Sequence, residues 1–336
     1  MIIRTAIVGL GNVNSRLLAI LENKRARLSD DHDVEFLIIC VADSKGVAIN
    51  LDGYDPKTIR EFKQNGHGVN EFEGFKPGVT MTDILKDIDC DLVFEGSPVD
   101  LQTGGPGLDV TRAALQRGIS VVLANKGPLV LAYQELHQIA EKNKAKLGFS
   151  ATVCGGLPVI NIGKRDMIAA DITKLRGIFN STSNFILDEM ATGRTYADAL
   201  AETQRRGIAE ADPTLDVGGW DTANKLSIIA NSILGVSVSL KDITVEGISD
   251  ITIQMLQQER ARGNVIKLVA EAEYGKLSVK PIALAKTDFL ANCDGWEMAV
   301  EIHSDLYGIM YHKLWEREPT PTAASMLRDA VNIFTN

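Results

Sequence analysis

Short apolar runs and amphipathic stretches alternate along the first 150 residues of the chain. The apolar runs predict strands at residues 2–8, 34–41, 91–94 and 119–123. Stretches with helical periodicity follow at about residues 15–27, 108–117 and 132–144. Strands that alternate with helices are typical of parallel βαβ units, so this half predicts an α/β fold, a Rossmann-type doubly wound parallel sheet.

One region interrupts this alternation. Residues 43–78 are rich in Gly, Asp and Asn, which predicts loops with one short helix.

The pattern changes after Phe149, where Gly155-Gly156-Leu157-Pro158 marks a boundary. A β-rich stretch is expected near residues 175–180, followed by several helices. Thr195 predicts the N-cap of one helix, and another is expected over residues 222–234. The second part of the chain therefore predicts a domain of mixed α+β structure.

Composition and charge are those of an ordinary globular protein with two domains. The chain has 336 residues, of which 45% are hydrophobic and 24% charged, and its formal net charge is −9. Net acidity provides no attraction to phosphate backbones or anionic lipids, so no nucleic-acid or membrane partner is expected. The apolar N-terminus is interpreted as a first strand and not as a targeting segment.

Cysteine usage indicates a cytoplasmic protein. Four cysteines lie far apart in the sequence, at Cys40, Cys90, Cys154 and Cys293. Because no C-x-x-C motif occurs, reduced thiols are expected, without a disulfide framework or a structural metal.

A glycine turn lies between the first strand and the first helix. Gly9 permits a tight turn, Gly11 lets backbone approach a pyrophosphate, and the helix that follows offers N–H groups to the phosphate. The third glycine of the dinucleotide motif is replaced by Asn14. The turn predicts a dinucleotide site, and the alternative is an ordinary strand-to-helix turn.

The end of the second strand leaves the choice of nucleotide open. Asp43 stands where an acid can bind the ribose hydroxyls of NAD. Ser44 and Lys45 follow directly and are suited to a 2′-phosphate, so NAD and NADP both stay possible.

An acidic segment in the second half predicts a catalytic site. Four acids fall within residues 210–221, among proline and glycine, and such a loop can bind an ammonium group. Asp221 and Lys225 are four residues apart on a predicted helix, so a lysine beside a carboxylate can act as a positioned acid for an incipient alkoxide. The alternative is a helix cap with a surface ion pair.

A second lysine, Lys126, follows the strand expected at residues 119–123. Ligands of open α/β sheets bind at the carboxyl ends of strands, which favours a functional role over a helix cap or a solvent-facing side chain.

The chain resembles homoserine dehydrogenase at several blocks that occur in the family's order. They are residues 9–13, 124–128, 151–158, 177–187 and 207–225, and the last of these is highly specific. Together they cover most of residues 1–235.

The resemblance implies the NADPH- or NADH-dependent, reversible reduction of L-aspartate 4-semialdehyde to L-homoserine, in the route to threonine and methionine. It implies a dinucleotide-binding domain of residues 1–149 completed by about 305–336. Residues 150–304 would then form a substrate-binding, catalytic and dimerisation domain of a homodimer.

The resemblance also implies roles for individual residues. Lys225 corresponds to the proton donor and Lys126 to a second catalytic lysine that contacts substrate. The residues implied to bind substrate are Glu210, Asp216, Asp221, Asn180, Ser181 and Thr182. Those implied to bind the nucleotide are Gly9, Gly11, Asn12, Val13, Asp43, Ser97, Asn125 and Lys126.

This chain departs from the family pattern at three places. Asn14 replaces a glycine, and Ser150 replaces a glutamate that often precedes a loop whose carbonyls bind a monovalent cation. Val153, Gly155 and Leu157 are the residues implied to hold Na⁺ or K⁺ there. The late glycine-rich turn near the nicotinamide is absent from residues 316–320. The chain is also expected to lack the regulatory domain of longer members.

Two other functions stay open from the sequence. An aspartate-semialdehyde dehydrogenase would need a nucleophilic cysteine, and Cys154 is the candidate. A nucleotide-sensing protein without catalysis would be consistent with the altered turns. The aromatic residues Trp296, Tyr307 and Trp315 are predicted to lie in the core.

Overall fold

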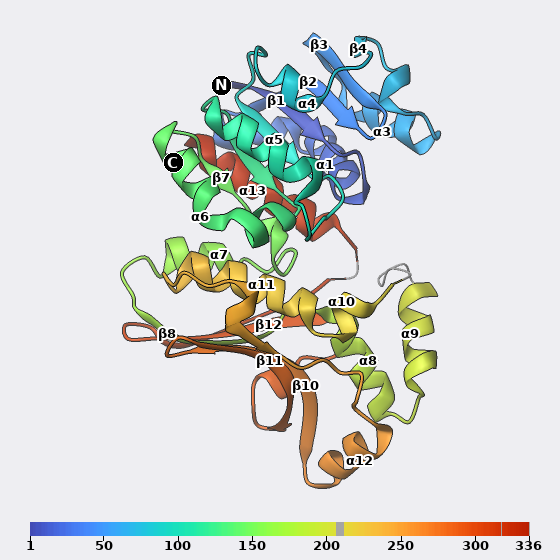
Figure 1. Ribbon diagram of the computed structural model, residues 1–336, viewed down its shortest axis with the longest axis vertical. Helices are drawn as coiled ribbons and strands as arrows, with labels where there is room; N and C mark the ends of the chain where they lie inside the picture. The colour runs from blue at the N-terminus through green and yellow to red at the C-terminus, as the bar shows by residue number, and fades with distance from the viewer. Residues whose placement is uncertain (206–211, 317, 336) are drawn as a thin grey trace. The chain divides into compact units, whose positions relative to one another are not determined.

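The computed structural model describes residues 1–205, 212–316 and 318–335, and divides the chain into two compact units. Unit 1 comprises Met1–Gly156 and Pro319–Asn336, and unit 2 comprises Leu157–Glu318 (Figure 1).

Unit 1 contains a seven-stranded sheet in the order β4-β3-β2-β1-β5-β6-β7. Its strands are β1 (Ile2–Val8), β2 (Glu35–Asp43), β3 (Gly46–Tyr54), β4 (Phe75–Lys76), β5 (Leu92–Glu95), β6 (Ser120–Leu123) and β7 (Leu147–Gly148). Five of these strands run parallel to one another, namely β2, β1, β5, β6 and β7. The predicted doubly wound parallel sheet is confirmed for this part, and its strand order reverses between β1 and β5.

The edge of this sheet differs from the prediction. β3 pairs antiparallel with β2, and β4 antiparallel with β3, where loops with one short helix were expected. That prediction was wrong because Val47 and Ala48 are buried in a tight β2–β3 hairpin, which glycine and aspartate content alone does not reveal.

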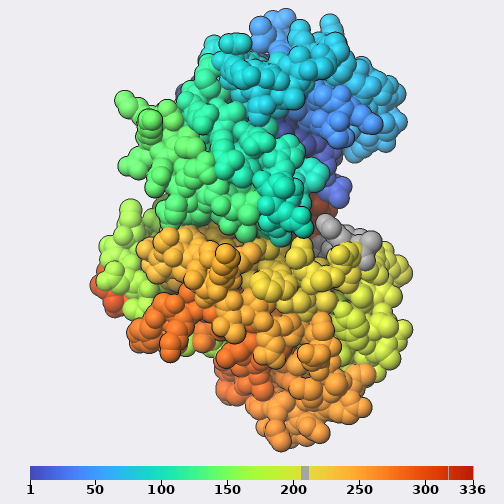
Figure 2. Space-filling model, in the orientation of Figure 1, coloured from blue at the N-terminus to red at the C-terminus, as the bar shows by residue number. Residues whose placement is uncertain are grey.

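Helices cover both faces of the sheet in unit 1. They are α1 (Asn12–Asn23), α2 (Arg25–His32), α3 (Pro56–Gln64), α4 (Met81–Ile84), α5 (Gly105–Gln116), α6 (Gly127–Lys142) and α13 (Thr320–Thr335). α5 packs beside α6, and α13 packs beside α1 (Figure 1). The teal and green atoms of α5 and α6 form part of the surface of this unit in the view of Figure 2. The helix expected over 15–27 is two helices, α1 and α2.

Unit 2 contains a six-stranded sheet in the order β13-β12-β8-β10-β11-β9. Its strands are β8 (Ile172–Ile178), β9 (Ile243–Val245), β10 (Asn264–Glu273), β11 (Lys276–Ala285), β12 (Glu297–Ser304) and β13 (Gly308–Trp315). All pairs are antiparallel except β11 with β9. The strands of the predicted α+β domain thus form one sheet that is antiparallel except at this pair.

The helices of unit 2 are α7 (Val159–Asn161), α8 (Ser181–Ala191), α9 (Tyr196–Arg205), α10 (Thr214–Val217), α11 (Trp220–Ile233) and α12 (Ile253–Ala261). α11 lies across one face of the sheet (Figure 1). The hydroxyl of Thr195 accepts a hydrogen bond from the Asp198 N–H at 3.1 Å, which confirms the predicted cap. Gly207, the expected end of that helix, lies outside the described residues.

The boundaries between the units differ from those expected at residues 149 and 305. β13 pairs with β12 in the second sheet, so residues 305–318 belong to unit 2 and the chain returns to unit 1 only at Pro319.

The predicted core aromatics divide into two groups. Trp296 is buried and stacks on Phe185, with ring centroids 3.9 Å apart. Tyr307 and Trp315 are 50% and 57% exposed, so their placement in the core was wrong. Tyr307 directly precedes the edge strand β13 and Trp315 is its last residue. Alternate side chains along this strand are exposed.

Candidate active site

Four side chains predicted from two separate parts of the sequence meet in unit 2. The Lys225 ammonium lies 2.7 Å from Oδ2 of Asp221 and donates to the carbonyl oxygen of Phe179 at 2.7 Å. Asn180 Nδ2 donates to the same Asp221 oxygen at 2.8 Å and to Oδ1 of Asp216 at 2.7 Å. The cluster therefore consists of one cation, two carboxylates and an amide that joins them.

Local structure places each member of the cluster. Asn180 is the N-cap of α8, where its Oδ1 accepts from the Ser183 N–H at 2.8 Å. Asp221 and Lys225 lie one turn apart on α11, which begins after Gly219 in a left-handed conformation with φ of 80°. Asp216 lies on the short helix α10 just before this turn.

Burial holds the cluster in place and strengthens the electrostatic interactions between its charged groups. The side chains of Asp221 and Lys225 are 8% and 16% exposed, and Asn180 is buried. Charges in such a site are screened little by solvent, so the ammonium is held in one place by two strong acceptors. The arrangement can present a positioned proton donor beside acceptors for a substrate ammonium group.

The remaining predicted substrate residues are placed as follows. Ser181 and Thr182 form the first turn of α8 beside the cluster. Glu210 lies outside the described residues. The prediction missed the Phe179 carbonyl and Ser183, although Asn-Ser-Thr-Ser is a readable N-cap signal.

The glycine turn of unit 1 has the geometry of a phosphate-binding turn. Gly9 has φ of 80°, and a Cβ there would lie 2.5 Å from the Gly96 carbonyl oxygen, so this position requires glycine. A Cβ on Gly11 would meet nothing within 4 Å. Since the fold itself leaves Gly11 free to carry a side chain, the open space next to it fits a bound phosphate. Asn12 and Val13 follow as the first residues of α1.

Asn14 does not block this turn. Its side chain is buried and donates from Nδ2 to the carbonyls of Val8 at 3.0 Å and Gly9 at 2.7 Å. The asparagine therefore fastens the end of β1 to α1 from inside, which accounts for its presence in place of a third glycine.

Asp43 ends β2, as predicted, and its carboxylate already has several donors. Lys63 Nζ lies 2.8 Å from Oδ2, and the Val69 N–H donates to the same oxygen at 3.3 Å. The backbone N–H of Lys45 donates to Oδ1 at 2.8 Å.

Ser97, Asn125 and Lys126 follow the strands β5 and β6 at their carboxyl ends. Asn125 Nδ2 donates to Ser97 Oγ at 3.3 Å, so the two turns are linked. Lys126 is the residue before α6. Lys126 belongs to unit 1, whereas Lys225 belongs to unit 2.

The loop expected to hold a cation contains Val153, Gly155 and Leu157. The carbonyl oxygen of Gly155 accepts a hydrogen bond from Ser325 at 3.0 Å. Ser150, which stands where the family often has glutamate, donates its N–H and hydroxyl to the Asp329 carboxylate at 2.7 and 2.8 Å. Among the described residues, no group of three His, Cys, Asp or Glu is placed to hold a metal.

Two further features concern a nucleophilic cysteine and membrane-spanning helices. Cys154 is fully buried, so its thiol cannot reach a substrate as a nucleophile. Within the part of the chain that the structure describes, no helix combines the length and apolar character of a membrane span.

The parallel sheet with its glycine turn, together with the lysine-carboxylate cluster, defines a nucleotide-dependent oxidoreductase. The family model "Homoserine dehydrogenase" matches residues 158–331. A homoserine dehydrogenase of Methanocaldococcus jannaschii is 34% identical over 331 residues, with 98% of each chain covered. The NAD(+)-dependent homoserine dehydrogenase of Pseudomonas canavaninivorans is 30% identical and covers 98% of this chain and 96% of its own.

Solved structures give the same result. A crystal structure from Archaeoglobus fulgidus superposes with a TM-score of 0.90 at 34% identity, covering 99% of this chain and 100% of its own. A hyperthermophilic archaeal homoserine dehydrogenase in complex with NADPH superposes with a TM-score of 0.84 at 25% identity, covering 99% and 98%. This chain belongs to the homoserine dehydrogenase family, whose members are NAD(P)-dependent oxidoreductases.

Proposed function

We propose that this chain interconverts L-aspartate 4-semialdehyde and L-homoserine with Lys225 as the proton donor, in the route to threonine and methionine. The observation that carries the proposal is the Lys225 ammonium held between the Asp221 carboxylate and the Phe179 carbonyl, both at 2.7 Å.

The chemistry requires a cation where charge develops. When a reduced nicotinamide delivers hydride to the aldehyde carbon, the aldehyde oxygen gains negative charge. An ammonium aimed at that oxygen stabilises the transition state more than the substrate, and can complete the reaction by giving up its proton. Asp221 and Phe179 hold Lys225 Nζ so that this interaction requires no reorganisation.

The acidic part of the cluster suits the substrate's ammonium group. Asp216 and Asp221 are joined through Asn180 and present carboxylate oxygens from two helices. Glu210, Ser181 and Thr182 complete this substrate-binding set in the proposal, and Lys126 acts as the second lysine that contacts substrate.

The nucleotide is proposed to bind along the carboxyl edge of the first sheet. The residues for its pyrophosphate are Gly9, Gly11, Asn12 and Val13, and Asp43 is placed for the adenosine ribose. Ser97, Asn125 and Lys126 are placed for the nicotinamide half. Asp43 is paired with Lys63, so this position offers both a carboxylate and a cation. The proposal therefore includes both NAD and NADP.

A monovalent cation, Na⁺ or K⁺, is proposed at the carbonyl oxygens of Val153, Gly155 and Leu157. Asp329 supports the proposal, because it brings a carboxylate to Ser150 at the start of this loop. The test compares activity in Na⁺ or K⁺ salts with activity in tetramethylammonium salts. Activity that is lost in tetramethylammonium would agree with such a site.

A homodimer in the cytoplasm is the proposed state. Large apolar side chains stand exposed along or beside β13, at Leu306, Tyr307, Ile309, Tyr311 and Trp315. A second copy of the chain would remove these apolar side chains from water.

The activity is tested by absorbance of the reduced nicotinamide when the purified protein meets L-homoserine with NAD or NADP. We expect turnover in the wild type, and we expect Lys225→Ala to reduce it by at least about 10³-fold. A folded protein that binds either nucleotide but turns over neither would contradict the proposal and favour a nucleotide sensor.

A further inference from the structure

A buried glutamate lies inside unit 1, where β5 ends. Glu95 is the last residue of β5, and its side chain is fully buried. Its Oε1 accepts from the Ser97 N–H at 2.9 Å and from the Ser97 hydroxyl. Among the described residues, its buried Oε2 has no hydrogen-bond partner. A buried carboxylate of this kind costs stability, because only part of its hydration is replaced.

Glu95 belongs to a polar cluster that ties two ligand-facing turns together. Asn125 uses its amide N–H groups on Ser97 Oγ and on the Pro98 carbonyl, both at 3.3 Å. Its Oδ1 accepts from the Gly127 N–H at 2.9 Å. The turn after β5 is therefore joined to the turn after β6.

The first turn of α5 is shaped to admit this cluster. A Cβ on Gly107 would lie 2.5 Å from Asn125 Nδ2 and 3.1 Å from both Glu95 Oε1 and Ser97 Oγ. Any side chain at Gly107 would displace the polar groups, so the cluster is a close-packed feature of the fold.

The cluster lies on the side of the sheet that suits the nicotinamide. Dinucleotides bind outside the carboxyl ends of the strands, across the point where strand order reverses, here between β1 and β5. The glycine turn and Asp43 follow β1 and β2, which assigns that half of the sheet to the adenosine portion. The turns after β5 and β6 are left for the nicotinamide portion. This step rests on the proposed function.

We infer that Glu95 is a positioning residue of the nicotinamide site and that its negative charge favours the oxidised nucleotide over the reduced one. The Ser97 hydroxyl donates to Glu95 and its oxygen accepts from Asn125, so Glu95 fixes the orientation of a side chain in this turn. The oxidised ring carries a positive charge and the reduced ring none. A fixed anion in a poorly screened site therefore stabilises only the oxidised form.

The charge on Glu95 changes in the neutral range. Burial raises the pKa of Glu95 to about 7, against hydrogen bonds from Ser97 and Asn125 that lower it. The main elements in contact with β5 are β1, β6 and α5, and their charged side chains are Arg4, Asp109 and Arg112. Asp100 of the loop after β5 and Lys126 after β6 are the nearest further charges in the sequence. None of them is among the causes of the pKa shift. Binding of the oxidised nucleotide should therefore release a proton and strengthen as the pH rises through 7.

The test measures the dissociation constants of NAD⁺, NADH, NADP⁺ and NADPH by calorimetry at pH 6 and pH 8.5. For whichever pair binds, we expect the wild type to bind the oxidised form about fivefold more tightly at pH 8.5, with less than a twofold change for the reduced form. In Glu95→Gln, which keeps an acceptor for Ser97, this pH step should vanish. A purely structural role for Glu95 would instead weaken both forms equally.

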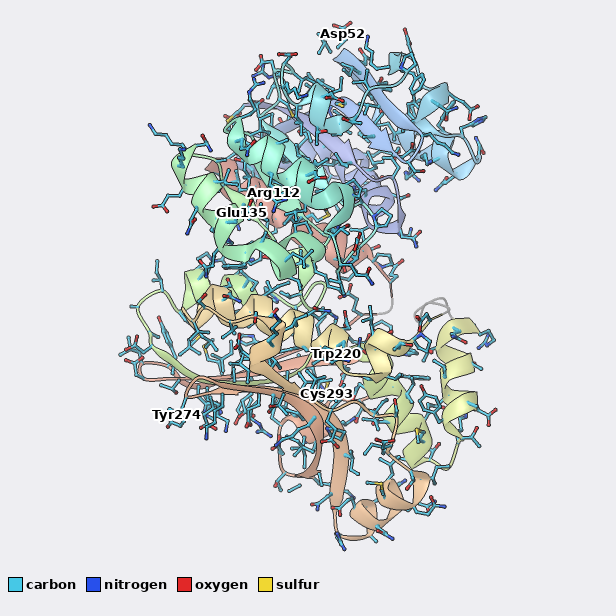
Figure 3. All side chains as sticks on the ribbon, viewed as in Figure 1. Asp52, Arg112, Glu135, Trp220, Tyr274 and Cys293 are labelled. Carbon is cyan, nitrogen blue, oxygen red and sulfur yellow. The ribbon has the colours of Figure 1, made fainter. Side chains whose placement is uncertain are left out.

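A matched control substitutes another glutamate of the same unit. Glu135 on α6 pairs with Arg112 on α5 at 2.6 Å, and Figure 3 shows these two side chains facing each other at the surface. Glu135→Gln should retain the full pH step. Ser97→Ala removes a hydrogen bond that lowers the pKa of Glu95, so the step should persist but move to higher pH.

Proton release provides a readout that needs no variant. Calorimetry of the wild type in buffers of different ionisation enthalpy should show release of a fraction of a proton with the oxidised form near pH 7. Absence of this release, or a pH step that survives in Glu95→Gln, would overturn the inference while homoserine turnover stood. A wild type that binds no nucleotide would overturn the proposed function with it.

Discussion

At the scale of single residues, the chemistry depends on side chains that serve two partners at once. Asn180 caps α8 through its oxygen and bridges Asp216 and Asp221 through its nitrogen. Asp221 accepts from both Asn180 and Lys225. Because these residues form a connected network, each substitution within it is expected to affect the others.

Asp221→Asn should reduce turnover while preserving the shape of the site. The neutral amide removes the anion that positions the Lys225 ammonium, so kcat/KM for L-homoserine should fall by roughly 10²- to 10⁴-fold. Steady-state kinetics against Asp166→Asn, a matched change at an exposed ion pair of unit 2, provides the measurement. Retention of activity within about twofold would remove Asp221 from the mechanism.

Glu95 also predicts a pH dependence of stability. Its pKa is raised from 4.5 to about 7, so the unfolded chain ionises first as the pH increases. The free energy of unfolding should therefore fall between about pH 4.5 and pH 7 and stay level above, by about 3 kcal/mol from this group. Urea denaturation of wild type and Glu95→Gln at pH 5 and pH 8 isolates the effect as a difference. A wild-type minus variant difference that is equal at both pH values would refute it.

At the scale of elements, the turn from β1 to α1 shows how one departure from a motif is accommodated. Asn14 lies inside the turn and binds the Val8 and Gly9 carbonyls, while the outer side of the turn stays open at Gly11. The third glycine of the motif permits close packing of helix and strand, and here a buried amide makes that contact.

Asn14→Gly should therefore destabilise the protein, although it restores the G-x-G-x-x-G sequence. The Gly9 carbonyl loses the Asn14 donor, the Val8 carbonyl keeps the Gly96 N–H, and a glycine enters the first turn of a helix. The combined cost is about 2 kcal/mol in the free energy of unfolding. Asn12→Gly, an exposed change in the same turn, reports the backbone part alone. Equal stabilities of these two variants in urea denaturation would show that the Asn14 hydrogen bonds contribute nothing.

At the scale of the whole molecule, the second sheet carries a face that a single chain leaves open. The strand β13 alternates, and Ile309, Tyr311 and Trp315 are about half exposed on the same side. An edge strand with such a face is prone to association, so a symmetric partner is the expected solution.

The dimer is tested by sedimentation. The wild type should sediment at twice the chain mass of 36.5 kDa, and the double variant Tyr311→Glu, Trp315→Glu at the mass of one chain. Tyr274→Glu is the matched control, because this tyrosine is 86% exposed at the turn between β10 and β11, and β8 and β12 separate β10 from β13 in the sheet. A wild type that sediments as a monomer at micromolar concentration would contradict the proposed dimer.

The sequence by itself determined what depends on neighbours along the chain. Alternating apolar and amphipathic runs predicted the parallel sheet, Gly9 predicted the left-handed turn, and Thr195 predicted a cap. The spacing of Asp221 and Lys225 predicted their contact, because residues four apart share a helix face. The family block around residues 207–225 predicted the chemistry.

Only the tertiary structure decided what depends on distant segments. The bridge from Asn180 to Asp216 and Asp221, the antiparallel β3 and the exposure of β13 all follow from how segments far apart in the chain pack together. The buried Glu95 belongs here too, because the largest cause of its raised pKa is burial, which segments distant in the sequence produce. Periodicity and spacing report local geometry only, whereas burial and hydrogen bonding in a site are properties of the packed molecule.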